Sequence, residues 1–289
     1  MIKSFIEMLV KAQKGGYAIG AFNTSNLEIT LAIARAAAKL KAPVIIQTSE
    51  SAIKYSNLPT LYNLIKNVAE TVAGKAPVAI HLDHGKDLSI IQECIKIGYS
   101  SVHIDASEKD FATNVRLSQK VQKLGKKAHC LVQAELGSIL GKEGLVRLEK
   151  GEINMEELMT DPEQAKKFVK LTKVDTLAIS VGTIHGRFVG IEKVDQVRLK
   201  KIYSLVKIPL VLHGASGLTP RDLKEAVANG VRIVNIDTNL RVAFKKALWK
   251  SMSHEKSMVD PRAILRPSTE AMQAEVERII KILGSANKA

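Results

Sequence analysis

Residues 77–106 read PVAIHLDHGKDLSIIQECIKIGYSSVHIDA, and this stretch contains one complete unit of the predicted fold. The short apolar runs at 77–83 and 101–106 are rich in β-branched residues and predict two strands. The segment 87–97 between them has the 3.6-residue periodicity of a helix. Because a helix separates two strongly apolar strands, we expect these strands to be parallel and covered on both faces.

The same alternation repeats along nearly the whole chain. Strands are predicted at 18–23, 43–49, 77–83, 101–106, 128–135, 176–182, 209–216 and 231–237. Helices are predicted near 26–41, 58–73, 87–97, 108–124, 161–172, 194–206 and 219–229, after a short N-terminal helix that ends at Gly15-Gly16. Eight parallel strand–helix units are typical of a closed (β/α)₈ barrel, or TIM barrel. We therefore predict the α/β class and one barrel domain over residues 1–289.

Local signals indicate where the elements end. N-caps are expected at Asn26, Asp87, Ser107 and Thr219, and helix ends at Gly98, Gly125 and Gly230. The segment from about 238 to 284 predicts two more helices, broken around Pro261 and Pro267, that pack outside the eightfold repeat. The connection 136–160 is long, polar and rich in glycine, as functional loops often are.

A doubly wound open sheet is the alternative fold. It would require a glycine-rich turn of the form G-x-G-x-x-G after the first strand. This chain has Phe22-Asn23-Thr24-Ser25-Asn26 at that point, which favours the barrel.

The composition limits the class of protein. The net charge of +14 would suit a nucleic-acid binder, but no basic run is interleaved with aromatic residues. A solvated basic surface that attracts anionic substrates is the preferred interpretation. The two cysteines, Cys94 and Cys130, have no C-x-x-C spacing, which predicts a reducing compartment. Without a signal-peptide core or a membrane-spanning apolar run, we expect a cytoplasmic protein.

Three histidines have the same local setting. His84, His185 and His213 each follow an apolar strand and precede a glycine. In a barrel these positions meet at the carboxyl end of the strands, where barrel enzymes carry their active sites. Three imidazoles leave one position open on a tetrahedral ion, so the pattern predicts a catalytic Zn²⁺ site.

Carboxylates and small residues fall at the same rim. Asp83 precedes His84, Asp105 ends the fourth predicted strand and Glu135 ends the fifth. So many charges at one barrel mouth would be stabilised by a cation. The last two strands lead into HGASG at 213–217 and NIDT at 235–238, where small residues and helix N-termini favour a phosphate site.

These motifs together resemble a known family. HLDHG at 81–85, QAELG at 133–137, GTIHG at 182–186, HGASG at 213–217 and NIDT at 235–238 are similar to motifs of the class II fructose-bisphosphate aldolases. The resemblance runs from about Phe22 to Thr238. It implies zinc-dependent cleavage of fructose 1,6-bisphosphate into dihydroxyacetone phosphate and glyceraldehyde 3-phosphate.

The resemblance also implies residue roles. His84, His185 and His213 would hold the catalytic zinc, with Asp105 and Glu135 at a second metal position. Asp83 would exchange the proton of the C4 hydroxyl, and Glu143 on the long loop would exchange the proton at C3 of dihydroxyacetone phosphate. The phosphate-binding positions would be Ser49, Gly186, Gly214, Ala215, Ser216, Asn235, Ile236, Asp237, Thr238 and Arg241.

Several positions depart from the family pattern. Gln133 stands where glutamate is frequent, Gly144 replaces an acid, and Val189 replaces a lysine that would contact phosphate. Tagatose 1,6-bisphosphate is the alternative substrate, and Asp237 with Arg241 favours fructose because tagatose enzymes tend to carry a small residue and a lysine there. A basic RNA-binding protein on an inactive aldolase scaffold is the alternative from another class.

The resemblance finally suggests partners and cofactors. A homodimer or homotetramer is expected, with Arg241 reaching the far phosphate across a subunit interface. Zn²⁺ is the expected cofactor, with a monovalent cation as an additional candidate.

Overall fold

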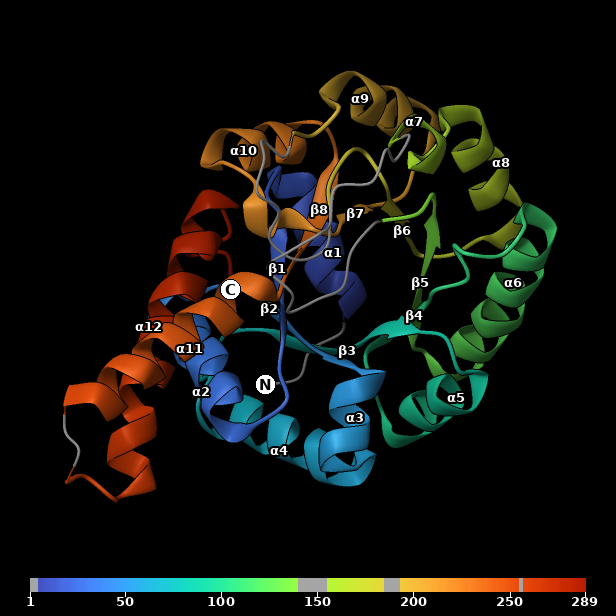
Figure 1. Cartoon of the computed structure of the whole chain (residues 1–289). Helices are drawn as coiled ribbons and strands as arrows, with labels where there is room; N and C mark the ends of the chain where they lie inside the picture. The colour runs from blue at the N-terminus through green and yellow to red at the C-terminus, as the bar shows by residue number, and fades with distance from the viewer. Residues whose placement is uncertain (1–4, 140–154, 185–192, 255–256) are drawn as a thin grey trace.

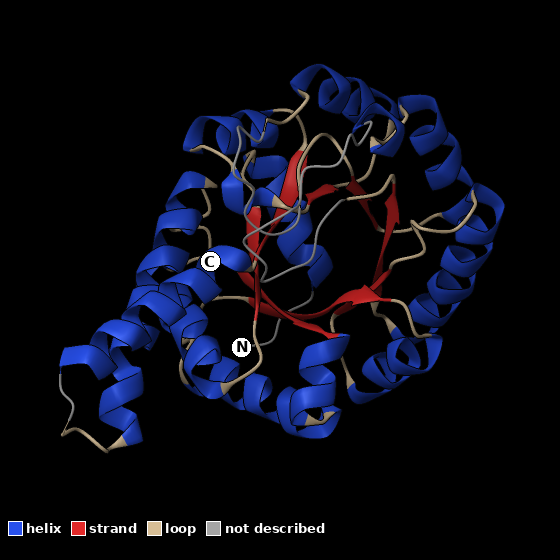
Figure 2. Ribbon diagram, in the orientation of Figure 1, coloured by secondary structure: helices blue, strands red, loops and turns tan. Residues whose placement is uncertain are grey.

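The computed structural model describes residues 5–139, 155–184, 193–254 and 257–289. Eight parallel strands close into one barrel in the order β1 to β8, which confirms the predicted fold class (Figures 1 and 2). The strands are β1 (Ile19–Asn23), β2 (Val44–Ser49), β3 (Val78–Gly85), β4 (Ser101–Ile104), β5 (Leu131–Leu136), β6 (Thr176–Ile179), β7 (Leu210–Leu212) and β8 (Val231–Ile236).

Most of the helices surround the barrel on its outer side, and α1 lies across its amino-terminal end (Figures 1 and 2). They are α1 (Phe5–Gly15), α2 (Leu27–Leu40), α3 (Glu50–Ser56), α4 (Leu58–Thr71), α5 (Leu88–Ile97), α6 (Phe111–Ala128), α7 (Met155–Leu158), α8 (Pro162–Thr172), α9 (Gln196–Leu205), α10 (Pro220–Ala228), α11 (Thr238–His254) and α12 (Pro261–Ile282), with a 3₁₀ turn η1 (Ala215–Gly217). The short helix α3, directly after β2, was not predicted, because seven residues carry too little periodicity to identify a helix.

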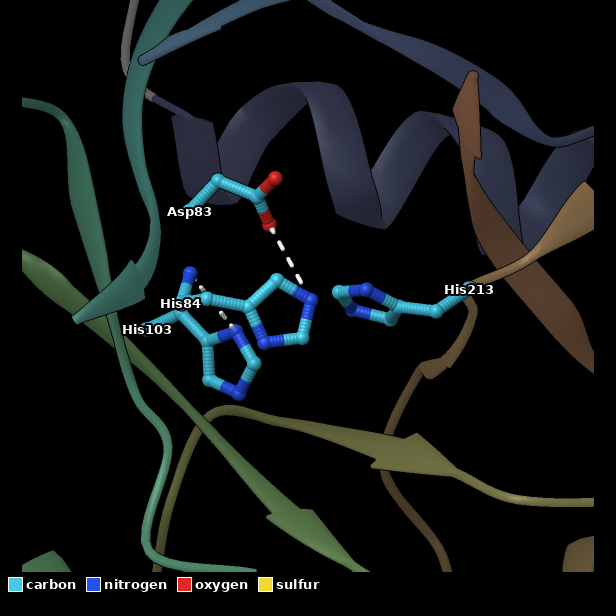
Figure 3. A group of neighbouring side chains, drawn as sticks. All are labelled: Asp83, His84, His103 and His213. Carbon is cyan, nitrogen blue, oxygen red and sulfur yellow. Dashed lines mark hydrogen bonds and ion pairs between the residues drawn. The ribbon is translucent and has the colours of Figure 1, made fainter. Parts of the chain in front are cut away.

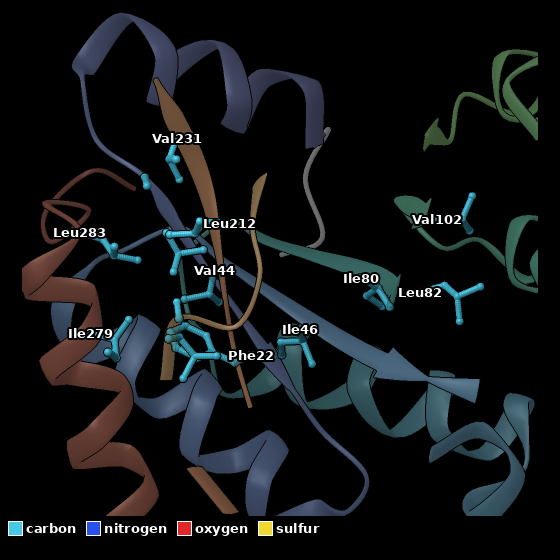
Figure 4. Packing of buried hydrophobic residues seen from close by; sticks show 14 of the residues in the cluster. Phe22, Val44, Ile46, Ile80, Leu82, Val102, Leu212, Val231, Ile279 and Leu283 are labelled. Atoms are coloured by element: carbon cyan, nitrogen blue, oxygen red, sulfur yellow. The ribbon is translucent and has the colours of Figure 1, made fainter. Parts of the chain in front are cut away.

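Among the described residues, two apolar clusters hold the fold together. The larger cluster lies between the outer faces of the strands and the helices, and Figure 4 shows Phe22, Val44 and Ile46 in it near Ile279 and Leu283. The smaller cluster fills the amino-terminal end of the barrel, where Phe5, Met8, Leu9 and Ala12 of α1 pack onto inward-facing strand residues. The amino-terminal end is thus closed by apolar packing, and the carboxyl end carries the polar side chains.

The predicted helix ends are partly confirmed. Asn26, Asp87 and Thr219 accept backbone N–H groups as N-caps, and Gly98 ends α5 in the left-handed conformation. Ser107 is not an N-cap: its hydroxyl donates to Asp105, and Asp110 caps α6 instead.

Gly125 does not end its helix, because α6 continues to Ala128 and His129 adopts the left-handed conformation there. A Cβ at Gly125 would come within 2.5 Å of the Cys130 carbonyl oxygen. This glycine is therefore required by close packing of α6 on β5, and β5 begins at Leu131 rather than at 128.

The two C-terminal helices lie beside the barrel, as predicted (Figure 1). Pro261 is at the first turn of α12, but Pro267 lies inside that helix and does not break it. Ser268 directly after it is buried and donates to the Phe244 carbonyl of α11. Packing between α11 and α12 therefore outweighs the hydrogen bond that proline removes.

Candidate active site

The side chains of Asp83 and His84 both point into the barrel mouth, although the two residues are neighbours in β3. In a regular strand, adjacent side chains point to opposite faces. Here the pairing of β3 with β4 shifts between Leu82 and Gly85, and His84 has a left-handed backbone with φ of 48°. A bulge of this kind redirects a side chain. The bulge turns His84 toward the same centre as the fully buried Asp83.

Three imidazoles meet there. The ring of His84 lies 4.7 Å from that of His213 and 4.9 Å from that of His103, centroid to centroid. Figure 3 shows these rings and the Asp83 carboxylate directed toward one another from β3, β4 and the end of β7. Their ligand atoms all lie within 4.8 Å of one another, so the group could hold a metal ion.

His103 was missed as a site residue. The alternation of side chains could have identified it: His103 is two residues before Asp105, so in the predicted strand 101–106 both side chains face the same side. His103 is completely buried, one layer below the rim.

A second group shares His84. His84 Nδ1 lies 2.8 Å from Asp105 Oδ2 and 3.9 Å from Glu135 Oε2, and these three residues also satisfy the spacing for a metal ion. Nitrogen and carboxylate ligands of this kind suit a divalent ion such as zinc. Among the described residues, Glu135 Oε2 and His103 Nε2 have no hydrogen-bond partner. The donor set of His84, Asp105 and Glu135 fits a bound metal.

The charges at this centre shift one another's pKa values. Burial and the nearby Asp105 carboxylate raise the pKa of Glu135 to about 8. Burial alone would lower the pKa of His84, but the carboxylates around it, Asp83 foremost, raise it well above its usual value. Burial, reinforced by His84, lowers the pKa of His103 to about 3. The cluster therefore concentrates both charge signs in a buried place, as active sites do.

Asp83 is held by amide groups. Asn23 Nδ2 donates to its Oδ2 at 2.9 Å, and Gln47 Nε2 donates to the same oxygen at 3.2 Å. Asn235 Nδ2 donates to Oδ1 at 3.2 Å. Burial alone would raise the pKa of Asp83, but His84, His81 and the Asn23 hydrogen bond lower it below the ordinary value. Asp83 is thus an oriented, ionised carboxylate beside the imidazoles.

A pocket of about 270 Å³ is lined in part by Asn23, the residue whose amide donates to the Asp83 carboxylate. It is lined by Asn23, Thr24, Ser25, Ile29, Ser49, Ser51, Ala52, Tyr55, Asp237 and Arg241. Arg241 Nε donates to Asp237 Oδ1 at 2.7 Å, and the Arg241 side chain is 48% exposed. Ser49 and Arg241 line this pocket from one and the same chain, which places a cation and hydroxyl groups together. The resemblance instead implied that Arg241 reaches the far phosphate across a subunit interface, and that part stays a prediction.

The loops after β7 and β8 have the expected small residues. Gly214 has φ of 65°, and a Cβ on it would come within 2.6 Å of the Ile184 carbonyl oxygen. Only glycine fits this approach. Ala215 and Ser216 form η1 directly after it, and Asn235 to Thr238 lead from β8 into α11.

The remaining predicted positions, His185, Gly186 and Glu143, lie outside the described residues. So do Gly144 and Val189. Gln133 is described, and its amide Nε2 lies 3.1 Å from His213 Nε2. In the described part of the chain, no helix combines the length and apolarity that a bilayer crossing requires.

Comparisons with known proteins agree with this geometry. The family described as "Fructose-bisphosphate aldolase class-II" matches residues 3–288. The fructose-bisphosphate aldolase of Thermus caldophilus is 36% identical to this chain, and the match covers 100% of both sequences. The fructose-bisphosphate aldolase of Helicobacter pylori (strain ATCC 700392 / 26695) is 38% identical, and the match covers 98% of both sequences. The crystal structure of the YdjI aldolase from Escherichia coli K12 superposes with a TM-score of 0.86 at 28% identity and 100% coverage of both chains. Fold, site and sequence therefore agree that this chain belongs to the class II fructose-bisphosphate aldolase family.

Proposed function

We propose that this chain catalyses the reversible aldol cleavage of fructose 1,6-bisphosphate to dihydroxyacetone phosphate and glyceraldehyde 3-phosphate, with a catalytic Zn²⁺. The family membership supports an aldolase, and the family is generally metal-dependent. The observation that carries the proposal is the meeting of Asp83, His84 and His213 at the barrel mouth. A pocket lined by Ser49 and Arg241 lies at the same end of the barrel and offers polar groups to an anion.

His84 and His213 are the described residues that we assign as zinc ligands, with His185 as the third. Their rings are close enough to share one ion. Asp105 and Glu135 would provide a second position through His84, which belongs to both groups. A bound zinc ion would polarise the ketose carbonyl as a Lewis acid.

Asp83 is assigned as the base of the cleavage direction. It would remove the proton of the C4 hydroxyl while the C3–C4 bond breaks, so that C4 becomes the aldehyde and the bonding electron pair stays on the C3 fragment. Its amide partners keep the carboxylate ionised and in one orientation. Glu143 would then protonate the C3 fragment to complete dihydroxyacetone phosphate.

Two places would bind the phosphates. Gly186, the Gly214–Ser216 turn and the Asn235–Thr238 segment would hold the dihydroxyacetone phosphate end, where backbone N–H groups of small residues can approach an anion. Ser49 and Arg241 would hold the far phosphate in the described pocket. Asp237, bonded to Arg241, would face the carbon at which fructose and tagatose differ.

The wider setting follows from the same proposal. We infer a single domain that assembles as a homodimer or homotetramer, with glycolysis or gluconeogenesis in the cytoplasm as its context. The two free, buried cysteines, Cys94 and Cys130, are compatible with a reducing compartment. Dependence of the cleavage rate on potassium or sodium would test the additional monovalent cation.

One experiment tests the proposal directly. The purified protein is analysed for bound metal and assayed for cleavage of fructose and tagatose 1,6-bisphosphate before and after treatment with a chelator. Bound zinc, chelator-sensitive cleavage and a higher kcat/KM on the fructose substrate are expected. A tagatose preference would overturn the assignment of Asp237 and Arg241. A metal-free protein with strongly salt-dependent RNA binding would support the alternative function instead.

A further inference from the structure

His103 lies at the centre of the histidine cluster, yet the proposed reaction gives it no task. Its ring lies 4.9 Å from that of His84 and 5.4 Å from that of His213, and none of its surface is exposed. A polar side chain in such a place is costly unless its nitrogens have partners. The contacts of the two ring nitrogens of His103, Nδ1 and Nε2, therefore indicate its role.

The first nitrogen fixes the tautomer. The backbone N–H of His84, in the bulge of β3, donates to His103 Nδ1 at 3.3 Å. A ring nitrogen that accepts a hydrogen bond carries no proton, so His103 is neutral and its proton is on Nε2.

The second nitrogen faces Glu135. His103 Nε2 lies 3.6 Å from Glu135 Oε2, and in the described part of the chain neither atom has a hydrogen-bond partner. The separation is about 0.6 Å longer than an ordinary N–H···O hydrogen bond. Because both atoms are buried and a donor faces an acceptor, a small rotation of the Glu135 side chain would satisfy both.

We propose that His103 is a positioning residue for the metal centre: its Nε2–H holds Glu135 Oε2 and so orients the carboxylate that groups with His84 and Asp105. His103 then connects two members of that group, through the backbone of His84 and the side chain of Glu135. It does not itself bind the ion, because Nε2 carries the proton. This inference rests on the proposed function for the identity of the ion.

The expected consequence is a change in metal affinity. Hydrogen-bond partners that orient metal-binding carboxylates typically contribute about 10- to 100-fold to metal affinity. Replacing His103 by an apolar residue should weaken zinc binding by that amount. Glutamine can place an amide N–H near the position of Nε2, so His103→Gln should recover most of the affinity.

The experiment is a zinc titration in competition with a chromogenic chelator. It compares the native protein, His103→Leu, His103→Gln and the control His81→Leu, with folding checked by circular dichroism. His81 is also a buried strand histidine, but it bonds the Ser101 hydroxyl at 2.7 Å rather than facing Glu135. Weaker binding in His103→Leu alone supports the proposal. In a Glu135→Gln background, His103→Leu should cause no further loss, because the residue acts through Glu135.

A second measurement does not depend on zinc. Nitrogen-15 NMR of the metal-free protein, with the His103 signals assigned from their loss in His103→Gln, should show the Nε2–H tautomer. The Nδ1–H tautomer, or native zinc affinity in His103→Leu, would overturn the inference and leave the proposed function intact. Absence of zinc binding by the native protein would refute the proposed function, while the tautomer would still decide the role of His103.

Discussion

The two ends of this barrel are built from the same strands but from opposite kinds of residue. In β1, Ile19 and Ala21 lie in the apolar cluster that α1 covers, whereas Asn23 at the other end donates to Asp83. In β3, Ala79 lies in the apolar cluster and Asp83 lies at the mouth. Within one strand, only a few residues separate the apolar amino-terminal end of the barrel from its charged carboxyl end.

The difference indicates which end stabilises the fold and which end does chemistry. The apolar end gains from burial and needs no partner to do so. At the polar end, burial opposes ionisation of Asp83 and Glu135, and the carboxylates depend on amides, imidazoles or a cation. Changes at the mouth should therefore alter activity and metal binding, and changes at the covered end should alter stability.

The largest effect is expected for Asp83→Ala. Removing a positioned acid–base group typically costs about 10²- to 10⁴-fold in rate, so cleavage should fall by at least that range while zinc remains bound. Steady-state kinetics and metal analysis on the same preparation check this. Asn23→Ala is the matched variant, because it removes one hydrogen bond to the carboxylate and leaves the carboxylate itself. Unchanged turnover in Asp83→Ala would exclude Asp83 as the base.

The opposite outcome is expected at the covered end. Ile19 is completely buried and pairs with Ile233 of β8. Ile19→Ala should lower the free energy of unfolding by about 2–5 kcal/mol, and Ile19→Val by about 0.5–1.5 kcal/mol. Urea denaturation measures this, with kcat and zinc affinity unchanged at a temperature where the variant is folded. A loss of zinc in Ile19→Ala at that temperature would show that the two ends are coupled.

The sequence predicts the barrel well because each strand is a distinct apolar run and each crossover has strong helix signals. It also places Asp83, His84 and His213 at one rim, since Asp83 and His84 lie at the carboxyl end of β3 and His213 directly follows β7. What it does not contain is the bulge at His84, because a left-handed residue in a strand depends on pairing with β4. The role of Gly125 was misread for a similar reason: contact with β5, not helix termination, requires the glycine.

A smaller effect is expected in the pocket at the mouth. Arg241 is half exposed and bonded to Asp237. A hydrogen bond to a charged group contributes about 1.5–3 kcal/mol, so Arg241→Ala should raise KM for fructose 1,6-bisphosphate by roughly 10- to 100-fold with a smaller change in kcat. Arg266→Ala, an exposed arginine on α12, is the matched control and should behave as the native enzyme does. Equal KM values in the two variants would exclude Arg241 from substrate binding.

The smallest effect concerns pH and the metal-free protein. The pKa of Glu135 is raised from 4.5 to about 8 and that of His84 is raised above 6.5, so the folded state binds more protons than the unfolded chain. The stability from these two groups is therefore lost as pH rises through their folded-state pKa values. The lowered pKa values of His81 and His103 have the opposite effect, so the stability from these two groups rises with pH. This rise is nearly complete by about pH 7.5, one unit above the ordinary pKa of histidine.

Between about pH 6.5 and 8, the metal-free protein should thus lose on the order of 1–2 kcal/mol of unfolding free energy, as measured by urea denaturation in chelator. Saturating zinc should reverse the sign, since the ion binds deprotonated ligands more tightly as pH rises. Glu135→Gln should reduce the loss in chelator, because it removes the carboxyl proton from the balance. If the metal-free protein kept the same stability at both pH values, the buried Glu135 and His84 would not determine how its stability depends on pH.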